Sequence, residues 1–153
     1  MSLERAKKHL EKYGLADRVR ITEQSSATVE LAAKAVGVEP GRIAKTLSFL
    51  VDGKAQLVLM EGTARIDNKK YKAAFHTKAK MIPPQDVEQL VGHAPGGVCP
   101  FGINEGIPVF LDVSLKKYDT VFPAVGTDNS DIELTIPELE KCSEAAGWVD
   151  IAK

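Results

Sequence analysis

The 153-residue sequence has few of the features that define exported or membrane proteins. Its only cysteines are Cys99 and Cys142, too few for a disulfide-stabilised scaffold. Neither belongs to a C-x-x-C pair, so the spacing does not indicate zinc binding or redox exchange. No apolar run approaches the roughly 20 residues of a membrane-spanning helix, and residues 1–6 are amphipathic rather than signal-like. We therefore expect a cytoplasmic protein with no membrane contact.

The usual side-chain catalysts are also missing. No serine–histidine–acid triad is visible, and the spacing of His76, His93 and Cys99 is not typical of a zinc site, so we expect no metal and no cofactor. A thiol nucleophile at Cys99 would need the His93 imidazole folded onto its sulfur, which remains an alternative. Residues 41–46 faintly resemble a phosphate-binding loop, but the glycine before the lysine is absent and a strand follows. A hydrolase would have to work without a side-chain nucleophile.

The composition fits one globular domain, because 44% of the residues are hydrophobic and 27% are charged. The net charge of −1 hides an asymmetry: residues 65–80 carry six cations against one anion, and residues 128–153 carry seven anions against two cations. A basic stretch beside a neutral pocket would hold a phosphate backbone, as in nucleic-acid binding. The alternative interpretation is a solvated helix face.

Hydrophobic periodicity predicts alternating helices and strands in a single mixed α/β domain. Helices are expected over residues 2–14, 28–37, 68–75, 84–92 and 135–147, with a helical turn at 114–118. Strands are expected over residues 19–21, 45–51, 56–60, 78–82, 108–112, 120–125, 132–134 and 148–151. The two strands around Asp52-Gly53 form a hairpin, since this dipeptide suits a two-residue turn.

Residues 92–102 form a loop that neither a regular helix nor a central strand can accommodate. Four of its eleven residues are glycine and two are proline. Glycine lets a ligand approach bare backbone N–H groups, and proline lowers the entropy cost of holding one shape. The loop is a candidate pocket wall, although a tight connection between a helix and a strand has the same composition.

Three motifs in this order resemble the YbaK and prolyl-tRNA-synthetase-associated editing domain family. They are IAKTLSF at residues 43–49, RIDNKK at 65–70 and GGVCPFG at 96–102, and the resemblance extends over nearly the whole chain. It implies one compact α+β domain over residues 1–153, with a central mixed, partly barrel-like sheet surrounded by helices. It also implies a trans-editing aminoacyl-tRNA deacylase, which hydrolyses the ester of a mischarged small amino acid (Ala, Cys or Ser) on tRNA, chiefly tRNA for proline. The implied partners are the 3′ acceptor end of that tRNA and a prolyl-tRNA synthetase complex.

The resemblance assigns roles to individual positions. Catalytic roles are implied for Lys45, which would bind the terminal phosphate or the amino-acid end, and for the amides of Gly97 and Val98, which would polarise the ester carbonyl. Water would attack with help from the substrate 2′-hydroxyl, so positioning is the main catalytic contribution. The implied substrate-binding residues are Thr46, Gly96, Cys99, Pro100, Phe101, Gly102, Gly126 and Ser130. The implied tRNA-binding residues are Arg65, Lys69 and Lys70.

The chain departs from the family pattern at two positions. The family loop often carries serine at the place of Cys99, and the segment ending in Ser130 ends in histidine in some members. Because of these departures, the resemblance does not identify which amino acid is removed or which tRNA carries it. A non-catalytic nucleic-acid or partner-binding module of the same fold therefore stays as an alternative.

Overall fold

A computed structural model describes residues 2–22 and 28–153; Met1, the start of the expected amphipathic segment, lies outside them. At the centre is a four-stranded sheet in the order β2 (Ala44–Val51), β3 (Lys54–Glu61), β4 (Val109–Asp112), β8 (Gly147–Val149). β2 and β3 form the predicted antiparallel hairpin, whereas β3–β4 and β4–β8 are parallel. The mixed α/β fold is confirmed. The sheet stays open at β2 and β8, so the expected barrel-like character holds only loosely.

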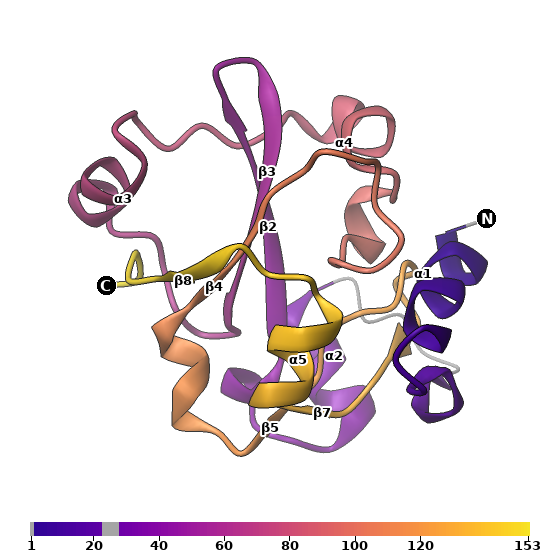
Figure 1. Cartoon of the computed structure of the whole chain (residues 1–153). Coiled ribbons are helices and arrows are strands. Elements are labelled where there is room, and N and C mark those ends of the chain that lie inside the picture. The colour runs from indigo at the N-terminus through magenta and orange to yellow at the C-terminus, as the bar shows by residue number, and fades with distance from the viewer. Residues whose placement is uncertain (1, 23–27) are drawn as a thin grey trace.

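The five predicted helices are confirmed among the described residues. They are α1 (Ser2–Glu11), α2 (Val29–Val36), α3 (Asn68–Phe75), α4 (Pro84–Val91) and α5 (Ile136–Cys142). Side-chain caps fix the start of three of them: Thr28 accepts a hydrogen bond from the Leu31 amide, Asp67 from two amides of α3, and Thr135 forms a capping box with Glu138. Figure 1 shows α1 and α3 on opposite sides of the long β2–β3 hairpin.

The remaining strands are short. β1 (Arg20–Ile21) pairs with β6 (Ser130–Asp131), and β5 (Thr120–Val121) pairs with β7 (Leu134–Thr135). The predicted strand at 78–82 is wrong, since only a single bridge joins Met81 to Phe49. The predicted strand at 120–125 ends after Val121, because Pro123 lacks an N–H and Phe122 and Ala124 bridge to different segments. Short 3₁₀ helices cover Ala16–Arg18, Pro40–Arg42, Pro95–Gly97 and Val113–Lys117.

Both faces of the sheet are covered. One face packs Leu57, Leu59 and Leu111 against buried residues of α1, α4 and α5. The other face packs Phe49, Val58, Met60 and Ile151 around Tyr71 of α3. In the described part of the chain, no helix combines the length and the apolar character that crossing a membrane requires.

Candidate active site

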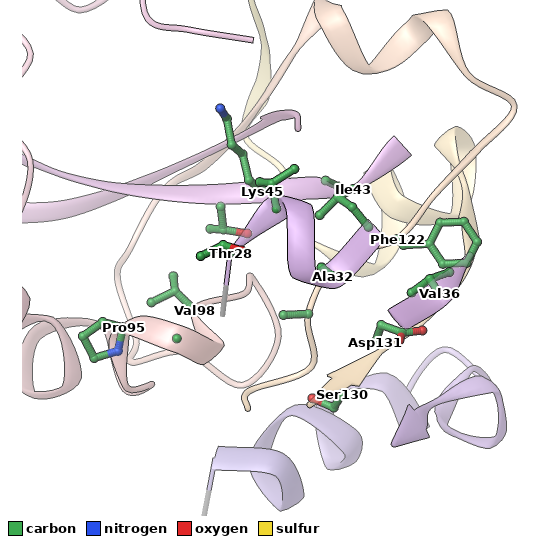
Figure 2. A pocket seen from close by; sticks show the side chains of 15 residues that line it. Thr28, Ala32, Val36, Ile43, Lys45, Pro95, Val98, Phe122, Ser130 and Asp131 are labelled. Carbon is green, nitrogen blue, oxygen red and sulfur yellow. The ribbon is translucent and has the colours of Figure 1, made fainter. Parts of the chain in front are cut away.

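A cavity of about 120 Å³ lies beside the first residues of β2. Four segments far apart in the sequence form its walls: α2 with its cap, the start of β2, the glycine-rich loop, and residues 122–131 (Figure 2). The lining residues are Thr28, Val29, Ala32, Val36, Ile43, Ala44, Lys45, Thr46, Pro95, Gly96, Val98, Phe122, Ala124, Ser130 and Asp131. Five residues that the resemblance pointed to therefore meet at one cavity: Lys45, Thr46, Gly96, Val98 and Ser130.

Lys45 is half-buried near the start of β2. Its Nζ donates a hydrogen bond to the carbonyl oxygen of Ala64, in the turn after β3. Figure 2 shows the side chain carrying Nζ away from Val98 and Ser130. Burial lowers the pKa of the ammonium group, and the charge of Glu61 opposes this shift. The cation thus lies at the edge of the cavity, fixed by a backbone oxygen.

Thr46 contributes an unusual polar atom to the wall. Its Oγ1 is buried, and among the described residues no group donates to it or accepts from it. A buried hydroxyl without a partner costs roughly 1–3 kcal/mol, so such an atom is rare in folded proteins. Thr46 lines the cavity as a residue, while its Oγ1 is buried beneath the surface.

Gly97 does not occupy the position expected of it. Its N–H donates to the Ala94 carbonyl oxygen at 2.9 Å, so this amide is already engaged inside the loop. Gly97 is buried behind the wall formed by Gly96 and Val98, packed against the backbone of Gly126 and Thr127. The Gly97 amide therefore does not face the cavity, and its role in polarising a carbonyl stays a prediction, whereas Val98 does line the cavity.

The second half of the loop turns into the core. Cys99 and Phe101 are fully buried, Pro100 is buried, and none of them lines the cavity. Gly102, at φ +66°, packs against the backbone of α1, and Gly126, at φ +87°, is buried against the first residues of that helix. These five residues shape the protein around the site, so the structure does not bring them to the cavity as substrate-binding groups.

The arrangement of Cys99 and His93 does not resemble a thiol–imidazole pair. Both side chains are buried and point to one acceptor, the Phe101 carbonyl oxygen, at 3.6 Å from the Cys99 sulfur and 2.6 Å from His93 Nε2. His93 Nε2 donates to this carbonyl and cannot take the thiol proton, and Nδ1 makes no hydrogen bond to the thiol or to any other described group. Burial also raises the pKa of the Cys99 thiol to about 12 and lowers that of His93. The thiol-hydrolase alternative finds no support here.

We expect the Cys99→Ser variant to keep its activity within about tenfold of the unchanged protein. The serine hydroxyl replaces a buried thiol that lies outside the cavity and can donate to the same carbonyl oxygen. Single-turnover hydrolysis of an aminoacyl-tRNA measures the effect, with the melting temperature as control for folding. An inactive but folded variant, or an acyl-thioester trapped on Cys99, would show that the thiol is the nucleophile.

Sequence reasoning missed part of the wall. Val29, Ala32 and Val36 lie in the predicted helix over residues 28–37, and an apolar helix pattern does not distinguish a cavity wall from a packing face. The centroid of the Phe122 ring lies 5.5 Å from the guanidinium carbon of Arg20 and 5.2 Å from that of Arg42. Asp131 binds Arg20 at 2.9 and 3.1 Å and lines the cavity from the far side. No pattern local to these residues marks the cavity.

The basic stretch lies on a different surface. Arg65 and Lys69 are exposed, as expected for residues that contact a large anion. Lys70 is partly engaged, because its Nζ binds Asp150 at 3.1 Å and the Ala152 carbonyl oxygen at 2.9 Å. Lys45 connects this surface to the cavity, since its partner Ala64 directly precedes Arg65. Within residues 2–22 and 28–153, no three acidic, histidine or cysteine side chains come together as metal ligands.

Comparison with known proteins agrees with these features. A family model described as "Aminoacyl-tRNA editing domain" matches residues 23–142. The chain is 47% identical to the uncharacterized protein YwhH of Bacillus subtilis, with 100% of the chain and 98% of YwhH aligned. It is 30% identical to the "Putative Cys-tRNA(Pro)/Cys-tRNA(Cys) deacylase EbsC" of Enterococcus faecalis, over 70% of the chain and 66% of EbsC.

Related domains also occur inside longer proteins and among solved structures. The proline–tRNA ligase of Bacillus licheniformis is 27% identical over 83% of the chain, which spans only 22% of that ligase. The crystal structure of "a putative trans-editing enzyme for prolyl tRNA synthetase" has a TM-score of 0.89 and 33% identity, covering 99% of this chain and 97% of that one. On this evidence, the chain belongs to the aminoacyl-tRNA editing domain family.

Proposed function

We propose that the protein is a trans-editing deacylase that hydrolyses the ester between a mischarged small amino acid and tRNA, with tRNA for proline as the first candidate. The observation that carries the proposal is the cavity itself, where the strand lysine motif, the glycine-rich loop and Ser130 meet. The relatives named as a deacylase and as a trans-editing enzyme support it. A prolyl-tRNA synthetase is the corresponding candidate partner, since related domains occur within such ligases.

The size and lining of the cavity favour a small amino acid. A volume of about 120 Å³ leaves room for a short side chain, and Ala32, Val36, Ile43 and Phe122 give the cavity an apolar portion of its wall. Such a pocket excludes larger residues by steric overlap. It separates substrates that differ by one methylene only weakly, by about 1–3 kcal/mol. Alanine and cysteine therefore fit the proposal best, and serine is the third candidate.

The chemistry needs no protein nucleophile. An aminoacyl ester is an activated bond, so a water molecule assisted by the vicinal ribose hydroxyl attacks a carbonyl that the protein holds in place. The loop amide at Val98 is the candidate donor to the developing oxyanion, and Thr46 is a candidate substrate-binding residue because it lines the same cavity. The protein contributes mainly orientation.

Lys45 is assigned to the terminal phosphate rather than to the amino-acid end. The amino-acid end carries an ammonium group, which would repel the Lys45 cation. A phosphate would attract the Lys45 cation. The position of Nζ at the Ala64 carbonyl, away from Val98 and Ser130, agrees with this assignment. Arg65 and Lys69 then extend the contact along the tRNA backbone, and the slope of tRNA affinity against salt concentration tests this extension.

We expect the purified protein to deacylate at least one tRNA charged with alanine, cysteine or serine, with no loss of rate in EDTA. The experiment is a panel of mischarged tRNAs that includes tRNA for proline, with the spontaneous hydrolysis of each ester subtracted. A panel without any accelerated hydrolysis, together with measurable tRNA affinity, would favour the non-catalytic binding module. Inhibition by EDTA would contradict the metal-free mechanism.

A further inference from the structure

Three backbone segments stack directly on one another behind the cavity wall. A Cβ atom at Gly97 would lie 2.4 Å from the Gly126 carbonyl carbon and oxygen and 2.5 Å from the Thr127 nitrogen. A Cβ atom at Gly126 would in turn lie 2.5 Å from the Ser2 carbonyl oxygen and 3.2 Å from the Leu3 nitrogen. Real Cβ atoms essentially never lie within 3.0 Å of another atom, so neither glycine leaves room for a side chain. The loop, the 126–127 turn and the start of α1 are therefore in contact without any side chain between them.

The start of α1 also holds the far end of the glycine-rich loop. A Cβ atom at Gly102 would lie 2.5 Å from the Arg5 carbonyl oxygen. The Arg5 guanidinium donates to the Gly92 carbonyl oxygen at 3.2 Å and to Asn104 Oδ1 at 3.3 Å. Ala6 and Leu10 are fully buried and anchor the helix in the core. One helix thus contacts both ends of the loop and the turn behind it.

The stack ends at groups that line the cavity. On one side Gly97 lies between Gly96 and Val98, both of which face the cavity. On the other side the Thr127 hydroxyl donates to Ser130 Oγ at 2.7 Å, and Ser130 lines the opposite wall. A displacement of α1 would therefore move both walls. The family model matches residues 23–142, and α1 lies before this range.

We propose that α1 positions the glycine-rich loop. It acts through the stacked backbone of Ser2, Gly126 and Gly97, which sets the distance between the two walls of the cavity. The expected effects on kcat and KM rest on the proposed deacylase function. Gly97 and Gly126 are positioning residues, because neither lines the cavity and each acts through its neighbours. Closely packed backbone transmits small shifts, and a misplacement of about 1 Å costs up to roughly a hundredfold in rate.

The first test compares Gly97→Ala with Gly147→Ala. Neither glycine has a positive φ, so an alanine is not strained by conformation at either site, and a Cβ at Gly147 has no described atom within 4 Å. We expect Gly97→Ala to lower kcat at least about tenfold with KM changed less than about threefold, because the wall moves while the mouth of the cavity is kept. Gly147→Ala should behave as the unchanged protein.

The second test addresses α1 itself. Gly126→Ala and Gly106→Ala carry the same conformational strain, with φ of +87° and +83°, but only at Gly126 would the added carbon meet another atom. We expect kcat to fall further in Gly126→Ala than in Gly106→Ala. If Gly126→Ala does not fold, Arg5→Ala takes its place, with Lys7→Ala as the control for a cation lost from the same helix.

Amide hydrogen exchange of residues 94–102 and 124–131 separates this inference from the proposed function. We expect faster exchange in both segments for Gly97→Ala and Gly126→Ala than for their controls, whether or not any tRNA is deacylated. Faster exchange without activity in the unchanged protein would overturn only the proposed function. Exchange and kcat equal to those of the matched controls would overturn the positioning role. A change confined to KM would do so as well.

Discussion

The Lys45→Ala variant is expected to lose at least about a hundredfold in kcat/KM, equivalent to roughly 2.7 kcal/mol of transition-state stabilisation. The reason is the loss of a half-buried cation at the edge of the cavity, which the Ala64 carbonyl oxygen holds in one place. A charge fixed in a partly desolvated site binds a phosphate more strongly than a mobile surface lysine does. Single-turnover deacylation with a substrate found in the panel is the measurement.

Two further substitutions identify the cause. Lys45→Met keeps most of the hydrocarbon stem without the charge, so it should be as inactive as Lys45→Ala if the charge matters. Lys45→Arg should retain part of the activity. Unchanged melting temperatures would exclude unfolding. Activity of Lys45→Met near that of the unchanged protein would show that Lys45 acts by packing and would remove it from the mechanism.

The same lysine predicts a pH dependence. Burial lowers the pKa of Lys45 in the folded protein, and the proposed contact with a phosphate needs the charged form. The catalysed rate should therefore fall as pH rises through this lowered pKa, earlier than an ordinary lysine would allow, after subtraction of spontaneous alkaline hydrolysis. Lys45→Arg should not show this decline, because a guanidinium stays charged throughout the range.

The Gly62→Ala variant is expected to lose about 3 kcal/mol of stability, with a fall in melting temperature of about 10 °C. Gly62 is buried after the end of β3, and a Cβ there would lie 2.0 Å from the Pro40 carbonyl oxygen and 2.7 Å from Val29 Cγ1. Backbone on one side and α2 on the other leave no room for the methyl group. The measurement is thermal or urea unfolding.

Gly147→Ala is the matched control for this variant, since neither position has a positive φ and the Gly147 site is open. A loss of less than about 1 kcal/mol in Gly62→Ala would show that residues 40–43 move aside at little cost. It would contradict the expectation that the backbone around Gly62 cannot accommodate a methyl group. Because Val29 also lines the cavity, an intermediate loss should be accompanied by weaker substrate binding.

Local signals in the sequence predicted the helices well, because each is marked by residues that act on their immediate neighbours. The side chains of Thr28, Asp67 and Thr135 cap the helices that follow them, and Gly37 and Gly92 end two helices in the left-handed conformation. The hairpin was likewise set by its own turn residues. Such features depend on fewer than about ten neighbouring residues and need no knowledge of the tertiary fold.

Pairing between distant segments was harder to predict. Residues 78–82 carry an apolar pattern suitable for a strand, but only Met81 bridges to the hairpin edge. The residues of the strand predicted over 120–125 pair with three different partners, Leu134, Ile43 and Asp131. A simple alternation of inward and outward side chains therefore does not predict their pairing. Which segment lies beside which is decided by packing across the whole chain.

The residues of the candidate site could also be predicted only in part. Lys45, Thr46 and the loop residues were identified through the resemblance, and the structure does bring Lys45, Thr46, Gly96 and Val98 to one cavity. Glycine-rich composition cannot distinguish a residue in the wall from a residue behind it. At Gly97, a side chain would collide with the backbone of Gly126 and Thr127.

The hydrogen bonds of the last residues have a consequence for synthesis on the ribosome. The Ile151 amide donates to the buried Asp112 carboxylate at 2.7 Å, its carbonyl accepts from Asp67, and the Lys153 amide donates to the Arg65 carbonyl oxygen. The turn that carries Ala64 and orients Lys45 is therefore completed by residues made about eighty positions later. A nascent chain that has not yet exposed Ile151 lacks these bonds and cannot hold the turn in place, so we expect ribosome-bound chains stalled before Ile151 to be inactive.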